Sequence, residues 1–141
     1  MSVTTQGRCL CGASAFTAKL KSETVDACHC SMCQTWGSGP FMAVECSEAP
    51  VFDDDSALGV FSSSDWAERV FCKSCGTPLM WRMKDGGHCS VSAGALTLSD
   101  KARFEVEIFI DEKPAYYDFA NDTRKMTGAE VIAAFTAGQE G

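Results

Sequence analysis

The stretch "ERVFCKSCGTPLMWRM", residues 68–83, sets a pair of cysteines between two apolar, strand-like runs. Cys72 and Cys75 stand three positions apart, and Gly76 follows at once. This is the spacing of a zinc knuckle, in which two thiolates fold over a tight turn and backbone N–H groups stabilise them. Glycine permits the positive φ that such a turn often needs. The stretch therefore predicts β-structure held by a thiolate-bound metal.

Cysteine is the informative residue in the rest of the chain as well. Seven of the nine cysteines fall into three tight clusters, "CLC", "CHCSMC" and "CKSC". A secreted disulfide scaffold would be shorter, would favour an even number of cysteines and would space them more widely. A redox Cys-x-x-Cys pair usually starts a helix in a βαβ unit, a pattern that is missing here. Metal binding by thiolates is the favoured interpretation.

The first cluster, "CLCG", resembles the last in its layout. Cys9 and Cys11 lie two apart, so both thiols can face one side of an extended segment, and Gly12 follows. Four thiolates from two such knuckles make a closed tetrahedral zinc site, which is the structural type. Spacing alone leaves other divisions of the seven thiols open.

The middle cluster offers three thiols, Cys28, Cys30 and Cys33. If a helical turn begins near Cys30, Cys33 lies on the same face and all three sulfurs can converge. Three protein ligands leave the fourth position open, which is the mark of a catalytic zinc. His29 would point away from the metal in an extended chain, so we expect it to be a hydrogen-bonding residue next to the site.

Composition and charge exclude several classes of protein. A chain of 141 residues fits one domain, spanning residues 1–141. The net charge is −7 and basic residues are scattered, which disfavours nucleic acids and anionic membranes as partners. No run approaches the about 18 apolar residues of a membrane helix, and no targeting segment is visible. We expect a cytoplasmic protein with reduced thiols.

The hydrophobic pattern predicts a mainly antiparallel β fold. "FEVEIFI" alternates strictly, which places Phe104, Val106, Ile108 and Ile110 on one face of a strand. "KDGG" at 84–87 is a hairpin turn signal, and the polar patch from Ser62 to Asp65 predicts a second hairpin between the runs that flank it. The expected strands are 13–20, 39–46, 57–64, 68–72, 77–83, 88–96 and 104–110.

Two helices are expected. A short helix is expected after the second cysteine cluster, around residues 30–35. A C-terminal helix should begin at a capping box of Thr127 and Glu130 and stop at Gly138.

The ordered motifs "GRCLCGASAF", "CHCSMCQTWGSGPF", "FCKSCGTPLMW" and "EIFIDEKPAYYDF" together resemble the glutathione-dependent formaldehyde-activating enzyme family, which includes the centromere-protein-V-like proteins. The resemblance covers about residues 7–120. It implies a zinc-pinned β-tent similar to the fold of methionine sulfoxide reductase B, with two zinc ions per chain. By this resemblance the structural zinc is bound by Cys9, Cys11, Cys72 and Cys75, and the catalytic zinc by Cys28, Cys30 and Cys33.

The resemblance also implies an activity. The family's namesake reaction joins glutathione and formaldehyde to S-hydroxymethylglutathione, which is a carbon–sulfur lyase reaction in reverse. The expected partner is therefore a small-molecule thiol or thiol–aldehyde adduct, and the cysteines would hold the metal without acting as nucleophiles. No catalytic residue beyond the metal ligands is predicted. The competing hypothesis is a non-enzymatic, zinc-stabilised scaffold or interaction domain, which would need both metal sites closed.

Other residues have weaker signals. Arg82 and Lys84 could receive the carboxylates of glutathione, although solvated surface charge explains them as well. Trp36 follows the middle cluster and could line a substrate pocket or simply pack in the core. Cys46 and Cys89 lack partners at ligand spacing, so we expect buried structural thiols. The segment "KPAYYDF" is expected at an edge near the site, with no chemical role assigned.

Overall fold

The computed structural model describes the backbone of residues 3–140 and the side chains of residues 3–136. The chain folds into two compact units. Unit 1 contains the chain up to Thr24 together with Ala43–Arg103, and unit 2 contains Val25–Met42 together with the chain from Phe104 onward. Strands dominate and two α-helices are present, so the predicted mainly β fold is confirmed.

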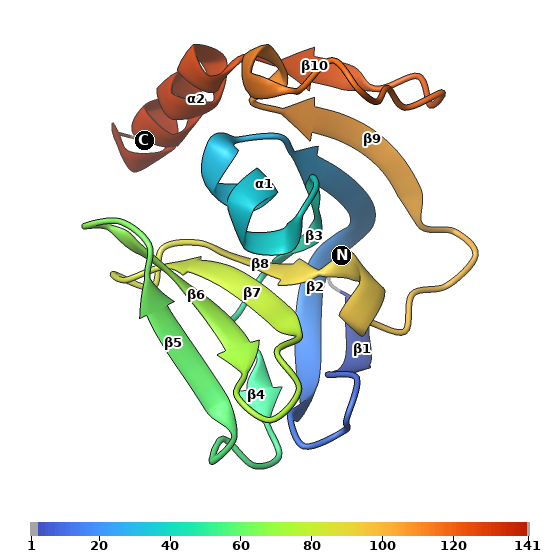
Figure 1. Cartoon of the computed structure of the whole chain (residues 1–141), viewed down its shortest axis with the longest axis vertical. Helices are drawn as coiled ribbons and strands as arrows, with labels where there is room; N and C mark the ends of the chain where they lie inside the picture. The colour runs from blue at the N-terminus through green and yellow to red at the C-terminus, as the bar shows by residue number, and fades with distance from the viewer. Residues whose placement is uncertain (1–2, 141) are drawn as a thin grey trace. The chain divides into compact units, whose positions relative to one another are not determined.

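Unit 1 is built around one antiparallel arrangement of strands (Figure 1). Its strands follow the order β2-β3-β8-β7-β6-β5, and both β1 and β4 pair with β2. The last residues of β2 and the first of β3 belong to unit 2. The bounds are β1 Val3–Arg8, β2 Ala15–Cys28, β3 Phe41–Cys46, β4 Val51–Phe52, β5 Leu58–Ser62, β6 Ala67–Cys72, β7 Pro78–Met83 and β8 Cys89–Ser92.

The predicted hairpins of unit 1 are confirmed. β5 and β6 pair in antiparallel fashion around the polar turn that follows Ser62. β7 and β8 pair across the "KDGG" turn, where Gly86 has φ +81° as a hairpin glycine should. The expected strand 88–96 is too long, because a 3₁₀ turn, η1 Ala93–Ala95, ends it.

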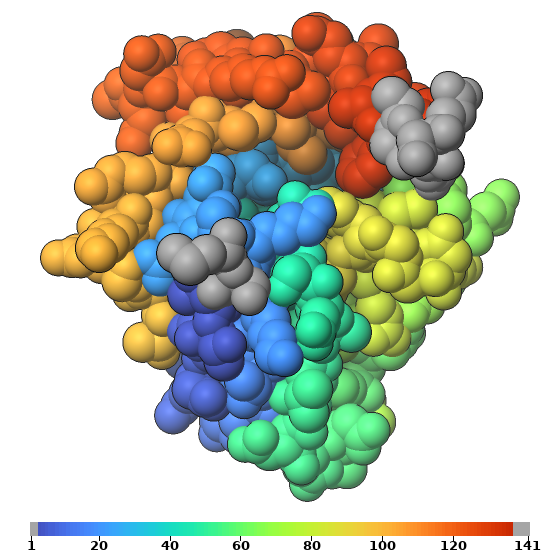
Figure 2. Space-filling view, turned by 180° about the vertical axis from the view of Figure 1, so that it is seen from behind, coloured from blue at the N-terminus to red at the C-terminus, as the bar shows by residue number. Residues whose placement is uncertain are grey.

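Two glycine–phenylalanine pairs make the strands of unit 1 pack closely. Gly7 pairs with Phe16 and Gly59 pairs with Phe71, each across neighbouring antiparallel strands. A Cβ on either glycine would lie 2.3 Å from the opposite ring, so only glycine lets the ring lie over the partner backbone. In the space-filling view, β1 and β2 lie side by side in dark and lighter blue (Figure 2).

Unit 2 carries both α-helices (Figure 1). β9 and β10 pair in parallel, which departs from the expected antiparallel pattern. The end of β2 continues this order as β10-β9-β2. The bounds are α1 Ser31–Gly37, β9 Arg103–Ile108, η2 Ile110–Glu112, β10 Arg124–Met126 and α2 Gly128–Glu140.

The burial of β9 differs from the sequence prediction. The alternating pattern predicted an apolar face, yet Phe104, Val106 and Ile108 are only half-buried. Glu107, on the opposite face, is 1% exposed. The strand ends before Ile110 because Phe109 adopts a left-handed conformation with φ +54°. A buried carboxylate needs hydrogen-bond partners, and those partners belong to the candidate site described below.

The start of α2 is predicted correctly and its end is not. The N–H of Thr127 donates to Glu130 at 3.0 Å, and the N–H of Glu130 donates back to the Thr127 hydroxyl at 3.2 Å, which forms the expected capping box. The helix continues through Gly138 to Glu140, since a glycine inside a helix costs only about 1 kcal/mol. None of the helices in the described part of the chain combines the length and apolar character needed to cross a membrane.

Candidate metal centres

Unit 1 brings Cys9, Cys11, Cys72 and Cys75 together as a four-thiol cluster whose Sγ atoms all lie within 4.8 Å of one another. The Sγ–Sγ distance is 3.6 Å between Cys9 and Cys11 and 3.8 Å between Cys11 and Cys72. Four thiolates arranged tetrahedrally around zinc at about 2.3 Å would lie about 3.8 Å apart. The spacing of the sulfurs therefore fits a closed zinc site.

The two turns that carry this cluster contain the positive-φ glycines that the sequence predicts. Gly12 has φ +85° and Gly76 has φ +82°, conformations that L side chains rarely adopt. The Gly76 N–H donates to the Cys72 carbonyl at 2.7 Å, and the Gly12 N–H donates to the Cys9 carbonyl at 3.2 Å. Each glycine thus closes the turn that points its two thiols the same way.

Hydrogen-bond donors near the four-thiol cluster favour the ionisation of some of its thiols more than that of others. The Thr77 hydroxyl, 3.1 Å from Cys75 Sγ, and the backbone N–H of Cys11 lower the pKa of Cys75 to about 5. The Ala13 N–H favours the thiolate of Cys11, but hydrogen bonding to Cys9 and burial outweigh it and raise the pKa of Cys11 to about 11. Neighbouring thiols cannot all ionise without a cation, so the electrostatics of this cluster suit a bound metal ion.

Unit 2 gathers Cys28, Cys30 and Cys33 as a three-thiol cluster, again with all Sγ atoms within 4.8 Å. Cys28 ends β2, Cys30 is the N-cap of α1, and Cys33 lies in its first turn, as the sequence predicted. The Cys33 N–H donates to Cys30 Sγ at 3.4 Å. Hydrogen bonding to the other two thiols, with burial, raises the pKa of Cys28.

His29 does not belong to the three-thiol cluster, although it lies between two of its cysteines. Its side chain is fully buried, with Nε2 2.8 Å from Glu107 Oε1 and Nδ1 2.6 Å from the Tyr117 hydroxyl. Both ring nitrogens are therefore occupied. Among the described residues no carboxylate or imidazole joins the three thiols in a metal-sized group. The protein thus offers three thiol ligands here and four in unit 1.

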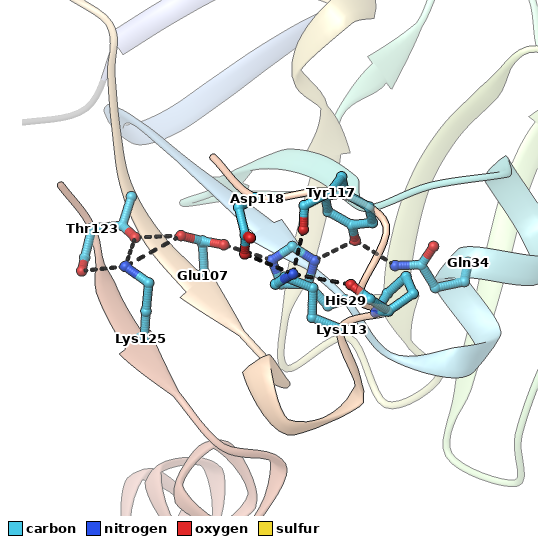
Figure 3. Close-up of polar contacts among 9 residues, drawn as sticks. His29, Gln34, Glu107, Lys113, Tyr117, Asp118, Thr123 and Lys125 are labelled. Atoms are coloured by element: carbon cyan, nitrogen blue, oxygen red, sulfur yellow. Dashed lines mark hydrogen bonds and ion pairs between the residues drawn. The ribbon is translucent and has the colours of Figure 1, made fainter. Parts of the chain in front are cut away.

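A chain of hydrogen bonds runs from α1 to β10 through His29 (Figure 3). Gln34 Nε2 donates to the Tyr117 hydroxyl at 2.7 Å. The hydroxyl in turn meets His29 Nδ1, and His29 Nε2 meets Glu107. The Thr123 hydroxyl donates to the second oxygen of Glu107 at 2.5 Å. In the sequence, two residues of this hydrogen-bonded network, His29 and Gln34, are immediate neighbours of candidate metal ligands.

The protonation pattern of this network follows from Glu107. Burial opposes ionisation, but hydrogen bonds from Thr123 and His29 prevail and lower the pKa of Glu107. An ionised carboxylate only accepts hydrogen bonds, so His29 Nε2 carries a proton and donates it. In the neutral imidazole Nδ1 then accepts from Tyr117. In that form the tyrosine hydroxyl donates toward the histidine and accepts from Gln34.

The loop that carries Tyr117 is held by Lys113. Its ammonium donates to the carbonyls of Pro114 and Tyr117, pairs with Asp118 at 2.8 Å, and lies 4.9 Å from the centre of the Tyr117 ring. The segment "KPAYYDF", expected near the site with no chemical role, supplies Tyr117 to the network. The sequence does not predict the roles of Tyr117, Glu107 and Gln34, because nothing in the pattern shows that these side chains meet.

Three weaker predictions concern possible substrate contacts by Arg82, Lys84 and Trp36. Arg82 donates to Glu68 at 2.7 Å and Lys84 donates to the Ser62 hydroxyl at 2.6 Å. Both cations belong to unit 1, whereas the three-thiol cluster belongs to unit 2. Trp36 lies in α1 and is half-buried. Its role in lining a substrate pocket stays a prediction.

The chain is similar in sequence to known proteins. A sequence model of the glutathione-dependent formaldehyde-activating enzymes matches residues 4–112. The chain belongs to this family. A Schizosaccharomyces pombe protein of the curated set, described as an uncharacterized lyase, is 37% identical over 128 residues, covering 90% of this chain and 93% of that protein.

A solved structure shares the family fold. The crystal structure of a Rhodobacter sphaeroides protein, a structural genomics target, superposes with a TM-score of 0.57 at 20% identity. The match covers 68% of this chain and 91% of that one. At this level of identity the likeness supports the fold alone.

Proposed function

We propose that this chain is a zinc-dependent carbon–sulfur lyase that forms and cleaves thiol–aldehyde adducts, with S-hydroxymethylglutathione as its adduct. Family membership and the relative described as a lyase support the reaction class. The observation that carries the proposal is the three-thiol cluster, whose sulfurs lie within 4.8 Å and are joined by no fourth cysteine, histidine or carboxylate ligand among the described residues. A reducing compartment, in which these thiols stay unoxidised, is part of the proposal.

The cysteines hold the metal in this proposal and do not attack the substrate. Zinc bound by Cys28, Cys30 and Cys33 would supply an open position that favours the thiolate of a substrate thiol or polarises an aldehyde oxygen. The four-thiol cluster of unit 1 has no such open position, so its metal would stabilise the fold only.

Tyr117 is the group that we assign to proton transfer. In adduct formation the thiol loses its proton, the sulfur–carbon bond forms, and the carbonyl electron pair moves to oxygen, which takes up a proton. The Tyr117 hydroxyl turns its proton from His29 to that oxygen while the hydrogen bond from Gln34 holds the phenol in place, and the proton released by the thiol to solvent restores the hydroxyl. In cleavage the same hydroxyl, as its conjugate base, takes the proton back.

His29 and Glu107 are positioning residues in this scheme. The ionised Glu107 holds the proton on Nε2 of His29, which keeps Nδ1 aimed at Tyr117.

Gln34 offers a further feature, since its Oε1 is buried without a hydrogen-bond partner among the described residues. A buried acceptor without a partner is costly unless a donor arrives, and a bound hydroxymethyl group would supply one.

The proposal is tested by turnover on the adduct. Zinc-loaded protein, with glutathione and ¹³C-labelled formaldehyde, should accelerate the exchange between free and adduct carbon in NMR above the uncatalysed rate. Protein freed of its labile metal is the matched control and should show only the uncatalysed rate. If the loaded protein accelerates neither direction and binds neither thiol nor aldehyde, the scaffold hypothesis replaces the enzyme.

A further inference from the structure

A second pair of thiols lies in unit 1, apart from the four-thiol cluster. β3 and β8 are antiparallel with Glu45 opposite Ser90, so the next step of the register sets Cys46 opposite Cys89. Directly opposed residues of antiparallel strands project to the same face with their Cβ atoms about 5 Å apart. Hydrogen bonding between the two thiols lowers the pKa of Cys46 and raises that of Cys89. The pair is therefore a preformed dithiol, which sequence spacing did not reveal.

A third sulfur adjoins this pair. β7 is the next strand, and its Met80 accepts a hydrogen bond from Cys89 Sγ at a distance of 3.4 Å. Cys46 is 6% and Met80 4% exposed, whereas Cys89 is half-buried. All three side chains line a cavity of about 600 Å³ in unit 1, which gives a small ion access to the sulfurs.

The donor set is uniformly soft. It consists of two thiols and one thioether, and within the described part of the chain no imidazole or carboxylate joins the two thiols in a metal-sized group. Zinc in proteins prefers four ligands drawn from cysteine, histidine and carboxylates. This site offers only two such ligands, so it is poorly suited to zinc. Thiolate and thioether ligands select monovalent copper.

We propose that Cys46, Cys89 and Met80 form a binding site for a soft monovalent cation, Cu(I). The ion replaces one proton on each thiol, so two protons leave and the bound unit carries one negative charge. Arg82, which pairs with Cys89 in the strand register, supplies a nearby positive charge and lines the same cavity. The site uses none of the residues of the proposed lyase centre, and its test does not depend on that activity.

The experiment is an anaerobic transfer of Cu(I) from its bicinchoninate complex to protein with its native metals in place. One equivalent of copper should transfer while elemental analysis shows no zinc release. X-ray absorption at the copper edge should then show sulfur ligands only. If the first equivalent of copper displaces an equivalent of zinc, copper has entered one of the other clusters and the proposal is wrong.

Substitutions locate the site. Cys46→Ala and Cys89→Ala should each weaken copper binding by more than about 100-fold, beyond the cost of losing an outer-shell partner. Met80→Leu should weaken it about tenfold. Met83→Leu is the matched control and should bind as wild type, since Met83 lines the same cavity on the same strand.

Two outcomes would overturn the assignment. Wild-type binding by Cys89→Ala excludes the pair as the site. Recovery of a Cys46–Cys89 disulfide in air from protein that takes up no copper shows a redox pair instead. Circular dichroism checks the fold of each variant. If both cysteine variants unfold, the copper-edge spectrum of the wild type and the Met80→Leu affinity decide the question.

Discussion

The two cysteine clusters of this protein use the same ligand type in different surroundings. In unit 1 four thiols project from two glycine turns, and the groups that hydrogen-bond to them include a threonine hydroxyl and backbone N–H groups. In unit 2 three thiols come from a strand end and a helix cap, and the residue between two of them, His29, is bonded to Glu107 and Tyr117. The number of thiols and the neighbouring titratable groups, rather than the ligand type, separate the proposed structural site from the proposed chemical one.

Removing a ligand from the four-thiol cluster should have the largest effect on stability. Cys72→Ser takes away one of four thiolates, and structural zinc binding is folding energy, so we expect a loss on the order of 5 kcal/mol or more. Denaturant unfolding and zinc per chain measure it. Ser74→Ala in the same turn is the control and should behave as wild type, because Ser74 is exposed. A Cys72→Ser protein with wild-type zinc content and unfolding midpoint would show that these residues are not ligands.

The corresponding change in the three-thiol cluster should abolish activity and spare the fold. Cys30 is the N-cap of α1, and serine is a preferred N-cap, so Cys30→Ser removes a thiol while keeping the helix start. We expect loss of the second zinc and of turnover, with a nearly unchanged circular dichroism spectrum. Global unfolding of this variant would instead make the cluster structural and remove the contrast between the two sites.

The neighbouring network should affect rate without affecting metal content. Tyr117→Phe removes the hydroxyl that meets His29 and Gln34, and we expect turnover to fall by about 10²- to 10⁴-fold, the usual worth of a positioned acid–base group. Zinc per chain should stay at the wild-type value. Tyr116→Phe is the matched control, since that side chain is 79% exposed, and it should keep full activity. Equal rates for the two variants would remove Tyr117 from the mechanism.

The smallest effect should come from the edge of unit 2. Thr127→Ala breaks the capping box of α2 and should cost about 1 kcal/mol of unfolding free energy. Zinc content and turnover should not change, because the two hydrogen bonds of the capping box join Thr127 to Glu130 and involve no thiol. A thermal melt with parallel zinc analysis measures both. Loss of zinc would mean that the three-thiol cluster depends on the C-terminal helix.

The sequence predicted the parts of this architecture that depend on local rules. Glycine turns, hairpins, the short helix at Cys30 and the capping box are all encoded by neighbours in the chain, and the structure confirms them. The grouping of the thiols also matches the prediction, although their role as zinc ligands stays a prediction.

The missed features depend on contacts between distant residues. Glu107 looked like the solvent face of an alternating strand, but His29, 78 positions away in the sequence, makes its burial possible. Tyr117 lies 88 positions from the same histidine. Cys46 and Cys89 lack ligand spacing because their proximity comes from strand register alone. Only the fold shows such pairs.

The contrast between a closed and an open zinc site is tested most directly by metal transfer to a chromogenic chelator. Native protein should release zinc in two phases of about equal amplitude, one ion per site. The fast phase should abolish turnover with the circular dichroism spectrum unchanged, glutathione should slow it, and added zinc should restore activity. The slow phase should coincide with unfolding. A single phase, or a fast phase that unfolds the protein, would contradict the division of labour between the two clusters.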